Sequence, residues 1–372
     1  MTQTADAIRG LVEQLLNEQG IALSGNPDQL EPSSVEVSLV GKQASVKITD
    51  STPRRRNLAE LRAALAARGA ALGAENAAIA EVLEVSGRAV AEDDPVPHVK
   101  NVVLVMSGKG GVGKSTVCAN LACALAAMGA RVGLLDADIY GPSVPTLFGV
   151  RSQPTGDGQK IHPIEKHGVK LMSIGFLLED EKSAVVWRGP MLHGALMQFL
   201  KDVAWGSLDY LLLDMPPGTG DIALTLAQRV QSNGAVVVTT PQEMALQDVY
   251  KAVAMNQKVG IPILGVVENQ SYFICPECTA RHELFGRGGG ERIAEQAGAP
   301  LLGQLPLVPA VQVASDSGMP VVVSQPESVA ARAFFELGER LGQVISTQNA
   351  ENSGDLTIDR SGGQNRHLPI AR

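Results

Sequence analysis

The first part of the chain shows apolar positions at helical and then at strand spacing. An apolar helical stripe runs through residues 4–19, and alternating apolar and polar positions around a turn at 41–43 predict a β-hairpin. A second helix and a short strand complete the segment. The predicted elements cover residues 4–19, 35–48, 57–68 and 81–85. Residues 1–90 are therefore expected to form a small α/β domain.

After residues 91–100, an acidic and proline-containing stretch predicted to be a linker, the pattern changes. Short continuous apolar runs alternate with helical segments, as in a parallel sheet that is buried on both faces. The runs lie at 102–106, 131–136, 210–214, 235–240 and 263–269. The helices lie at 114–128, 189–203, 244–258, 288–297 and 327–345. We predict an α/β fold at 101–346 with a mostly parallel, doubly wound sheet that binds its ligand at the carboxyl ends of the strands. Residues 347–372 are Ser/Gly/Asn/Gln-rich and are predicted to be disordered.

Composition narrows the class of protein. The chain has 372 residues, 45% of them apolar and only 3% aromatic, with 39 glycines, which fits an α/β protein with many tight turns. A net charge of −8 argues against a protein that coats nucleic acid. Four cysteines do not make a disulfide scaffold, and neither a membrane-spanning apolar run nor a signal peptide is recognisable. We expect a soluble protein of the cytoplasm that binds neither nucleic acid nor membrane.

The strongest motif is SGKGGVGKST at residues 107–116, between a predicted strand and a predicted helix. Gly108, Gly113, Lys114 and Ser115 satisfy the phosphate-loop pattern. The glycines let backbone N–H groups converge on phosphate oxygens, the lysine supplies positive charge, and the serine ligates Mg²⁺. The predicted ATP-binding residues of this loop are Gly108, Lys109, Gly110, Gly111, Val112, Gly113, Lys114, Ser115 and Thr116.

Lys109 gives the loop a second lysine directly after its first glycine. This form resembles the deviant Walker A loop of the ParA/MinD/nitrogenase-iron-protein group of ATPases. The resemblance implies that Lys109 reaches the nucleotide of a partner subunit, so that ATP lies within a symmetric dimer. Asn269, at the end of another predicted strand, resembles the asparagine that reads adenine in these ATPases. The alternative for Lys109 is an exposed lysine without a role. The alternative for Asn269 is a residue that only forms a turn.

Acidic residues close two of the predicted strands. Asp136 and Asp138 follow one run, and Asp214 ends another. Mg²⁺ is usually held by one or two carboxylates together with phosphate and water oxygens, so we predict that Ser115, Asp136 and Asp214 hold it. The resemblance implies that Asp138 orients or deprotonates the attacking water. Turn residues or helix caps are the alternative for the aspartates. The predicted catalytic residues are Lys109, Lys114, Asp138 and Asp214.

Cys275 and Cys278 stand two residues apart, a spacing that suits one metal ion or one iron–sulfur cluster. A thiolate site needs four such ligands. A zinc site that also uses His282, and a redox or inert dithiol, are alternatives. Cys118 and Cys123 lie among apolar residues of the helix after the phosphate loop and are expected to be buried.

Several motifs together closely resemble the Mrp/ApbC family of iron–sulfur carrier ATPases over residues 100–340. They are KGGVGKST, LLDADIYGPS, WRGPM (187–191), DMPPGTGD, VENQSYFICPEC and FGRGGGER (285–292). The resemblance implies a homodimer in which each subunit offers Cys275 and Cys278 to one bridging [4Fe–4S] cluster. It also implies an ATPase that transfers this cluster to apo-proteins.

A spatial organiser of the MinD or ParA kind, with the two cysteines in a structural zinc site, is the main alternative function. Its membrane-bound form needs a basic amphipathic helix, and the end of this chain shows no such stripe. A chaperone that inserts another metal, such as nickel, is a third possibility.

The N-terminal segment resembles the small MIP18-type domain that precedes many members of the family. Those domains usually carry a T-P-x-C-P turn, whereas residues 51–56 of this chain read STPRRR and contain no cysteine. The three arginines are predicted to form a solvated helix start.

Overall fold

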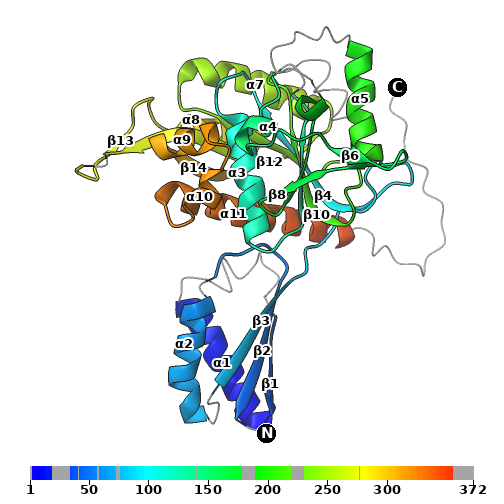
Figure 1. Cartoon of the computed structure of the whole chain (residues 1–372). Helices are drawn as coiled ribbons and strands as arrows, with labels where there is room; N and C mark the ends of the chain where they lie inside the picture. The colour runs from blue at the N-terminus through cyan, green and yellow to red at the C-terminus, as the bar shows by residue number, and fades with distance from the viewer. Residues whose placement is uncertain are drawn as a thin grey trace, which may run out of the picture.

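The computed structural model describes residues 2–18, 34–40, 42–56, 58–72, 76–138, 141–177, 189–218, 230–275 and 277–354. A small N-terminal domain adjoins a larger domain built on one central sheet (Figure 1). Helices in the described part of the chain are too short or too polar to cross a membrane.

The N-terminal domain packs helices on one face of a small sheet (Figure 1). Its elements are α1 (Thr2–Glu18), β1 (Ser34–Val40), β2 (Gln43–Asp50), α2 (Leu58–Gly69), η1 (Ala70–Leu72) and β3 (Asn76–Leu83). Strands β1 and β2 form the predicted antiparallel hairpin, and β3 adds in parallel to β2. Apolar side chains of α1, α2 and all three strands share one core, because their spacing places them on facing surfaces.

The sheet of the larger domain has the predicted doubly wound character. Its strands are β4 (Val99–Ser107), β5 (Val132–Asp136), β8 (Ile164–Lys166), β9 (Val169–Ser173), β10 (Leu208–Asp214), β11 (Gly234–Thr239), β12 (Ile263–Ile274), β13 (Arg281–His282) and β14 (Leu301–Leu307). Their order is β13-β12-β11-β4-β10-β5-β9-β8, and β14 pairs with β12. Only the pairs β8–β9 and β12–β13 are antiparallel among these described strands. Strands β6 (Thr155–Gly156) and β7 (Ile161–His162) form a separate ribbon.

Helices cover both faces of this sheet. They are α3 (Lys114–Ala127), α4 (Val144–Leu147), η2 (Ile174–Leu177), α5 (Gly189–Asp202), α7 (Glu243–Lys258), α8 (Gly289–Ala297), α9 (Pro309–Asp316), α10 (Val321–Ser324) and α11 (Val329–Gly354). In β4, Val103 and Val105 join the core shared with α3 and α11. The alternate residues Val102 and Leu104 join the core shared with α5. A strand whose two faces are both buried reads as a continuous apolar run, which is why the sequence predicted it.

Helix α11 extends beyond the predicted end at residue 345 and includes the start of the segment predicted to be disordered. The physical reason is a set of buried polar contacts. Asn349 is 2% exposed, and its amide donates to Asn101 Oδ1 at 2.9 Å. Gln348 Nε2 donates to the carbonyl oxygen of Asn233 at 2.9 Å. Residues 355–372, the rest of the predicted tail, lie outside the described residues.

The arginine run at 54–56 is not a solvated helix start, so that prediction is wrong. The Arg56 side chain is 1% exposed and pairs with Asp50. The backbone N–H of Arg55 donates to Glu339 Oε1 of α11 at 2.8 Å. The Arg55 guanidinium lies 4.4 Å from the ring centroid of Phe335, also on α11. The run therefore forms part of the contact between the two domains.

Candidate nucleotide and metal site

The phosphate loop lies between the end of β4 and the start of α3 at Lys114. Gly113 precedes the helix with φ of 82°, and Gly111 has φ of 85°, a left-handed conformation that other residues rarely adopt. Gly108 lies directly against the backbone of α7, with no room for a side chain. The loop is thus built to present backbone N–H groups and the α3 N-terminus to an anion.

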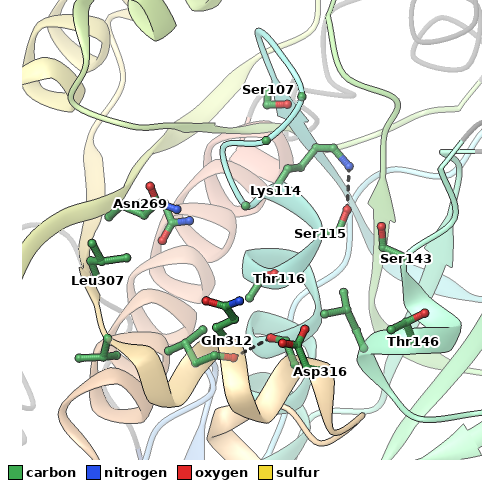
Figure 2. A pocket seen from close by; sticks show the side chains of 18 of the residues that line it. Ser107, Lys114, Ser115, Thr116, Ser143, Thr146, Asn269, Leu307, Gln312 and Asp316 are labelled. Atoms are coloured by element: carbon green, nitrogen blue, oxygen red, sulfur yellow. Dashed lines mark hydrogen bonds between the residues drawn. The ribbon is translucent and has the colours of Figure 1, made fainter. Parts of the chain in front are cut away.

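Lys114 and Asp214 form a buried ion pair at the base of this loop. Lys114 is 6% exposed and Asp214 is fully buried. Lys114 Nζ also lies 3.3 Å from Ser115 Oγ, as Figure 2 shows. The second carboxylate oxygen of Asp214 is buried without a hydrogen-bond partner among the described residues. The Ser115 hydroxyl and the Asp214 carboxylate both contact Lys114 Nζ, and a buried carboxylate oxygen that lacks a donor fits a hard cation such as Mg²⁺.

Asp136 lies fully buried next to this pair, but donors of the chain already engage its oxygens. Oδ1 accepts the N–H of Asp138 at 3.1 Å. Oδ2 accepts the N–H groups of Ser143 at 3.0 Å and Val144 at 3.1 Å, and the Ser173 hydroxyl at 3.0 Å. These contacts favour a role in holding the segment that carries Asp138. Direct ligation of Mg²⁺ by Asp136 remains a prediction.

The environment of Asp136 also predicts a pH effect on stability. Burial and the Asp214 carboxylate raise its pKa from 3.8 to about 7, although the Val144 N–H, Lys114 and Ser173 oppose the shift. Between pH 3.8 and about 7, Asp136 therefore keeps its proton in the folded protein and loses it in the unfolded chain. This contribution to stability is complete below the unfolded pKa of 3.8 and is lost as the pH rises through the folded value of about 7.

Urea unfolding of nucleotide-free wild type and Asp136→Asn should reveal this contribution by difference. We expect the free energy of unfolding of the wild type, relative to the variant, to fall as the pH rises from about 4 to about 7 and then to level off. A difference that stays constant across this range would contradict the assignment.

A cavity of about 870 Å³ opens from the phosphate loop. The predicted site residues that line it are Lys109, Gly110, Gly111, Gly113, Lys114, Ser115, Thr116, Asp138 and Asn269. Asn269 Nδ2 donates to the carbonyl oxygen of Val112 at 2.8 Å, so this side chain contacts the loop itself. The structure thus brings together residues that are far apart in the sequence.

Sequence reasoning missed one wall of the cavity. Leu307 at the end of β14 and Gln312 and Asp316 of α9 line it, as Figure 2 shows. Leu307 is the last residue of a strand that was not predicted, and no motif marks α9. A proline at the first position of α9 is the one local signal that could have located this helix.

Cys275 and Cys278 lie at the tip of the hairpin between β12 and β13, which extends away from the body of the domain (Figure 1). The Cys275 N–H donates to the carbonyl oxygen of Ala280, and its own carbonyl accepts the N–H of Thr279, both at 2.9 Å. Pro276 lies outside the described residues. Backbone N–H groups of Cys278 and Glu277 point to the Cys275 sulfur and lower its pKa. A thiolate stabilised in this way is suited to bind a metal.

The other two cysteines have the opposite environment. Cys118 and Cys123 are buried in α3. Burial raises the pKa of Cys118 well above its usual value and that of Cys123 to about 12. Their predicted role as core residues is confirmed.

The zinc alternative that joins His282 to the cysteine pair receives no support. Within the described ranges, no three His, Cys, Asp or Glu side chains gather to hold a metal ion. The His282 ring instead lies against Phe273, with 6.4 Å between the ring centroids. Trp187 and Arg188 of the WRGPM motif, and the DMPPGTGD motif from residue 219 onward, lie outside the described residues.

Comparison with known proteins places this geometry in a family. The model of a ParA-type family, the NUBPL iron-transfer P-loop NTPases, matches residues 98–342. The chain belongs to this family. An iron-sulfur cluster carrier protein of Aquifex aeolicus is 52% identical over 255 residues, 68% of this chain and 70% of that protein. An Escherichia coli protein of the same name is 51% identical over 262 residues, 70% of this chain and 71% of its own length.

Solved structures agree with the family. A nucleotide-binding protein of Archaeoglobus fulgidus in complex with ADP is 40% identical, with a TM-score of 0.57 over 67% of this chain and 97% of its own. The cell division ATPase MinD of Pyrococcus furiosus is 25% identical, with a TM-score of 0.50 over 66% of this chain and 99% of its own. The chain is a P-loop NTPase of the MinD/ParA type, and its enzymatic activity is ATP hydrolysis.

Proposed function

We propose that this protein is an ATP-hydrolysing carrier that holds a [4Fe–4S] cluster between two identical chains and passes it to apo-proteins. The observation that carries the proposal is the exposed hairpin tip, where backbone N–H groups lower the pKa of Cys275 beside Cys278. Relatives named iron-sulfur cluster carrier proteins support the choice of cargo.

The cysteine count supports a dimer. A [4Fe–4S] cluster takes four thiolates, and the hairpin offers two. The buried Cys118 and Cys123 cannot reach it without unfolding α3. A two-fold axis near the hairpin doubles every ligand, so two chains complete one site.

The nucleotide site supplies the energy for this carrier. Ser115 and Asp214 are the residues that would hold Mg²⁺, which neutralises phosphate charge when bound. Lys114 binds the β- and γ-phosphates, Asp138 orients the attacking water, and Lys109 contacts the nucleotide of the partner subunit. Asn269 contacts the adenine. Hydrolysis then shifts the pair of chains between two arrangements with different affinity for the cluster.

Iron and sulfide analysis after anaerobic reconstitution tests the proposal. We expect the wild type to bind one [4Fe–4S] cluster per two chains, and Cys275→Ser and Cys278→Ser to bind almost none, because each removes two of four ligands from the dimer. Cys118→Ala and Cys123→Ala are matched controls that should keep the cluster. Iron retained by the hairpin variants, or a wild type that binds zinc instead, would overturn the proposal.

A further inference from the structure

Strand β12 links the two sites directly. Asn269, Gln270 and Phe273 of this strand line the nucleotide cavity. Cys275 follows the last residue of the strand, Ile274. The wall of the nucleotide cavity and the base of the cysteine hairpin are therefore one continuous piece of backbone.

The pairing of this strand with β14 is irregular at the cavity. Its register with β14 shifts between Glu268 and Tyr272. Gln270, within this irregular stretch, has φ of 53°, a left-handed conformation that is uncommon for a residue other than glycine. Such conformations persist only where the surroundings impose them, and they concentrate at sites of ligand binding and switching.

Glu268, at the start of this irregular stretch, is held by hydrogen bonds inside the protein. Its carboxylate is fully buried. It accepts the Ser271 hydroxyl at 2.6 Å, the N–H of Gly290 at 2.5 Å and Gln304 Nε2 at 3.2 Å. These donors come from the cysteine-bearing strand, from the start of α8 and from β14. One carboxylate thus joins three segments around the hairpin base.

The packing around this carboxylate leaves little freedom. A side chain on Gly290 would come within 2.8 Å of Glu268 Cβ, so α8 approaches the strand closely only through a glycine. The next residue of the strand, Asn269, contacts the phosphate loop through its side chain, at Val112. A nucleotide that displaces Asn269 therefore also displaces the backbone of the adjacent Glu268, which is hydrogen-bonded to Ser271, to α8 and to β14.

We propose that Glu268 is a positioning residue that transmits nucleotide occupancy along β12 to the Cys275–Cys278 hairpin. The nucleotide contacts Asn269 and Gln270, and the Glu268 carboxylate makes Ser271, α8 and β14 follow as one unit. The hairpin then has a different arrangement with and without nucleotide. The inference rests on the proposed function for its biological meaning, because the hairpin is the site of the cluster.

Thiol alkylation of reduced, metal-free protein measures this coupling. Iodoacetamide modification of Cys275 is followed by mass spectrometry of peptides, with and without saturating Mg–ADP. We expect ADP to change the rate constant at Cys275 by about fivefold or more in the wild type, the lower range of typical coupling between sites. In Glu268→Gln, which keeps the shape but replaces one acceptor oxygen by a donor, we expect this ratio to fall close to one.

Glu283→Gln is the matched control. It is the same substitution near the foot of the same hairpin, at a residue whose ion pair with Arg287 is largely exposed. This variant should keep the full effect of ADP. ADP affinity, measured by calorimetry, should stay within about twofold of the wild type in both variants, since neither side chain lines the cavity.

Ser271→Ala removes only one of the three donors, and we expect it to retain part of the ADP effect. If Glu268→Gln does not fold, the ADP effect in Ser271→Ala tests the proposal instead. An unchanged ADP effect in folded Glu268→Gln and Ser271→Ala, or no ADP effect in the wild type, would overturn the proposal. Because the assay uses metal-free protein, its outcome is independent of whether the protein binds a cluster, which iron analysis decides.

Discussion

Lys114→Met should reduce the rate of ATP hydrolysis on the order of 100- to 1000-fold, the typical effect of removing one group that stabilises charge in a transition state. Methionine keeps the length of the lysine stem but not its charge. The loop backbone, Ser115 and Asp138 remain in place, so nucleotide binding should weaken less than turnover. Steady-state hydrolysis and ADP binding, measured on the same preparation, separate the two effects.

The same substitution should also destabilise the nucleotide-free protein, because it leaves the carboxylate of Asp214 buried without its partner. Removing one member of a buried ion pair costs about 3–5 kcal/mol. Adding Asp214→Asn to Lys114→Met removes the unpaired charge. We expect the double variant to recover part of the lost stability in urea unfolding but none of the lost hydrolysis. Recovery of activity without Lys114 would contradict the role assigned to it.

The nucleotide site could be predicted from the sequence to the extent that its parts are local. The phosphate loop needs a strand, a glycine-rich turn and a helix in direct succession, and all three lie within residues 99–127. Asp214 could be added because the carboxyl ends of parallel strands meet at one edge of the sheet. Asn269 could be added only from the family resemblance, since β12 continues past it to Ile274. Their approach to Lys114 and Val112 in space follows from the strand order.

The parts that could not be predicted depend on contacts between distant segments. The sequence predicts that Asn349 belongs to a disordered tail, because nothing near it in the sequence shows that Asn101 and Ser86 satisfy its amide. Glu268 lies within the motif VENQSYFICPEC, but its role as a buried acceptor could not be predicted, since its donors lie up to 36 residues away. Polar side chains carry no periodic pattern that tells a buried, hydrogen-bonded group from a solvated one.

The burial of the arginine run at 54–56 also could not be predicted from the neighbouring sequence. A charged triplet after a turn is usually exposed, and only the fold places Asp50 and Glu81 next to Arg56. The resemblance to MIP18-type domains predicts a cysteine in this turn, where the chain has arginines at 54–56. In this chain the turn is used for ion pairs and for contact with α11.

Arg56→Ala should destabilise the N-terminal domain by about 3 kcal/mol, the lower end of the range for breaking a buried ion pair, because it removes the guanidinium that contacts both oxygens of Asp50, while Arg54 stays 3.9 Å from Asp50 Oδ1. The Arg56 guanidinium contacts both oxygens of Asp50 and lies 3.1 Å from Glu81 Oε1. A loss of this size is a large part of the total stability of a small domain. Hydrogen exchange of the β1–β3 amides, followed by mass spectrometry, should show them opening while the β4 amides remain protected.

Arg55→Ala is the matched control, since it removes a neighbouring arginine whose partner Glu327 is 77% exposed. Exposed pairs contribute about 1 kcal/mol or less, so exchange in β1–β3 should change little. The backbone N–H of Arg55 still reaches Glu339 in this variant, because alanine keeps that donor. If Arg56→Ala and Arg55→Ala gave equal and small effects, burial of Arg56 would not be what stabilises the domain. A large effect of Arg56→Ala alone would show that this turn holds the domain together through the buried pair.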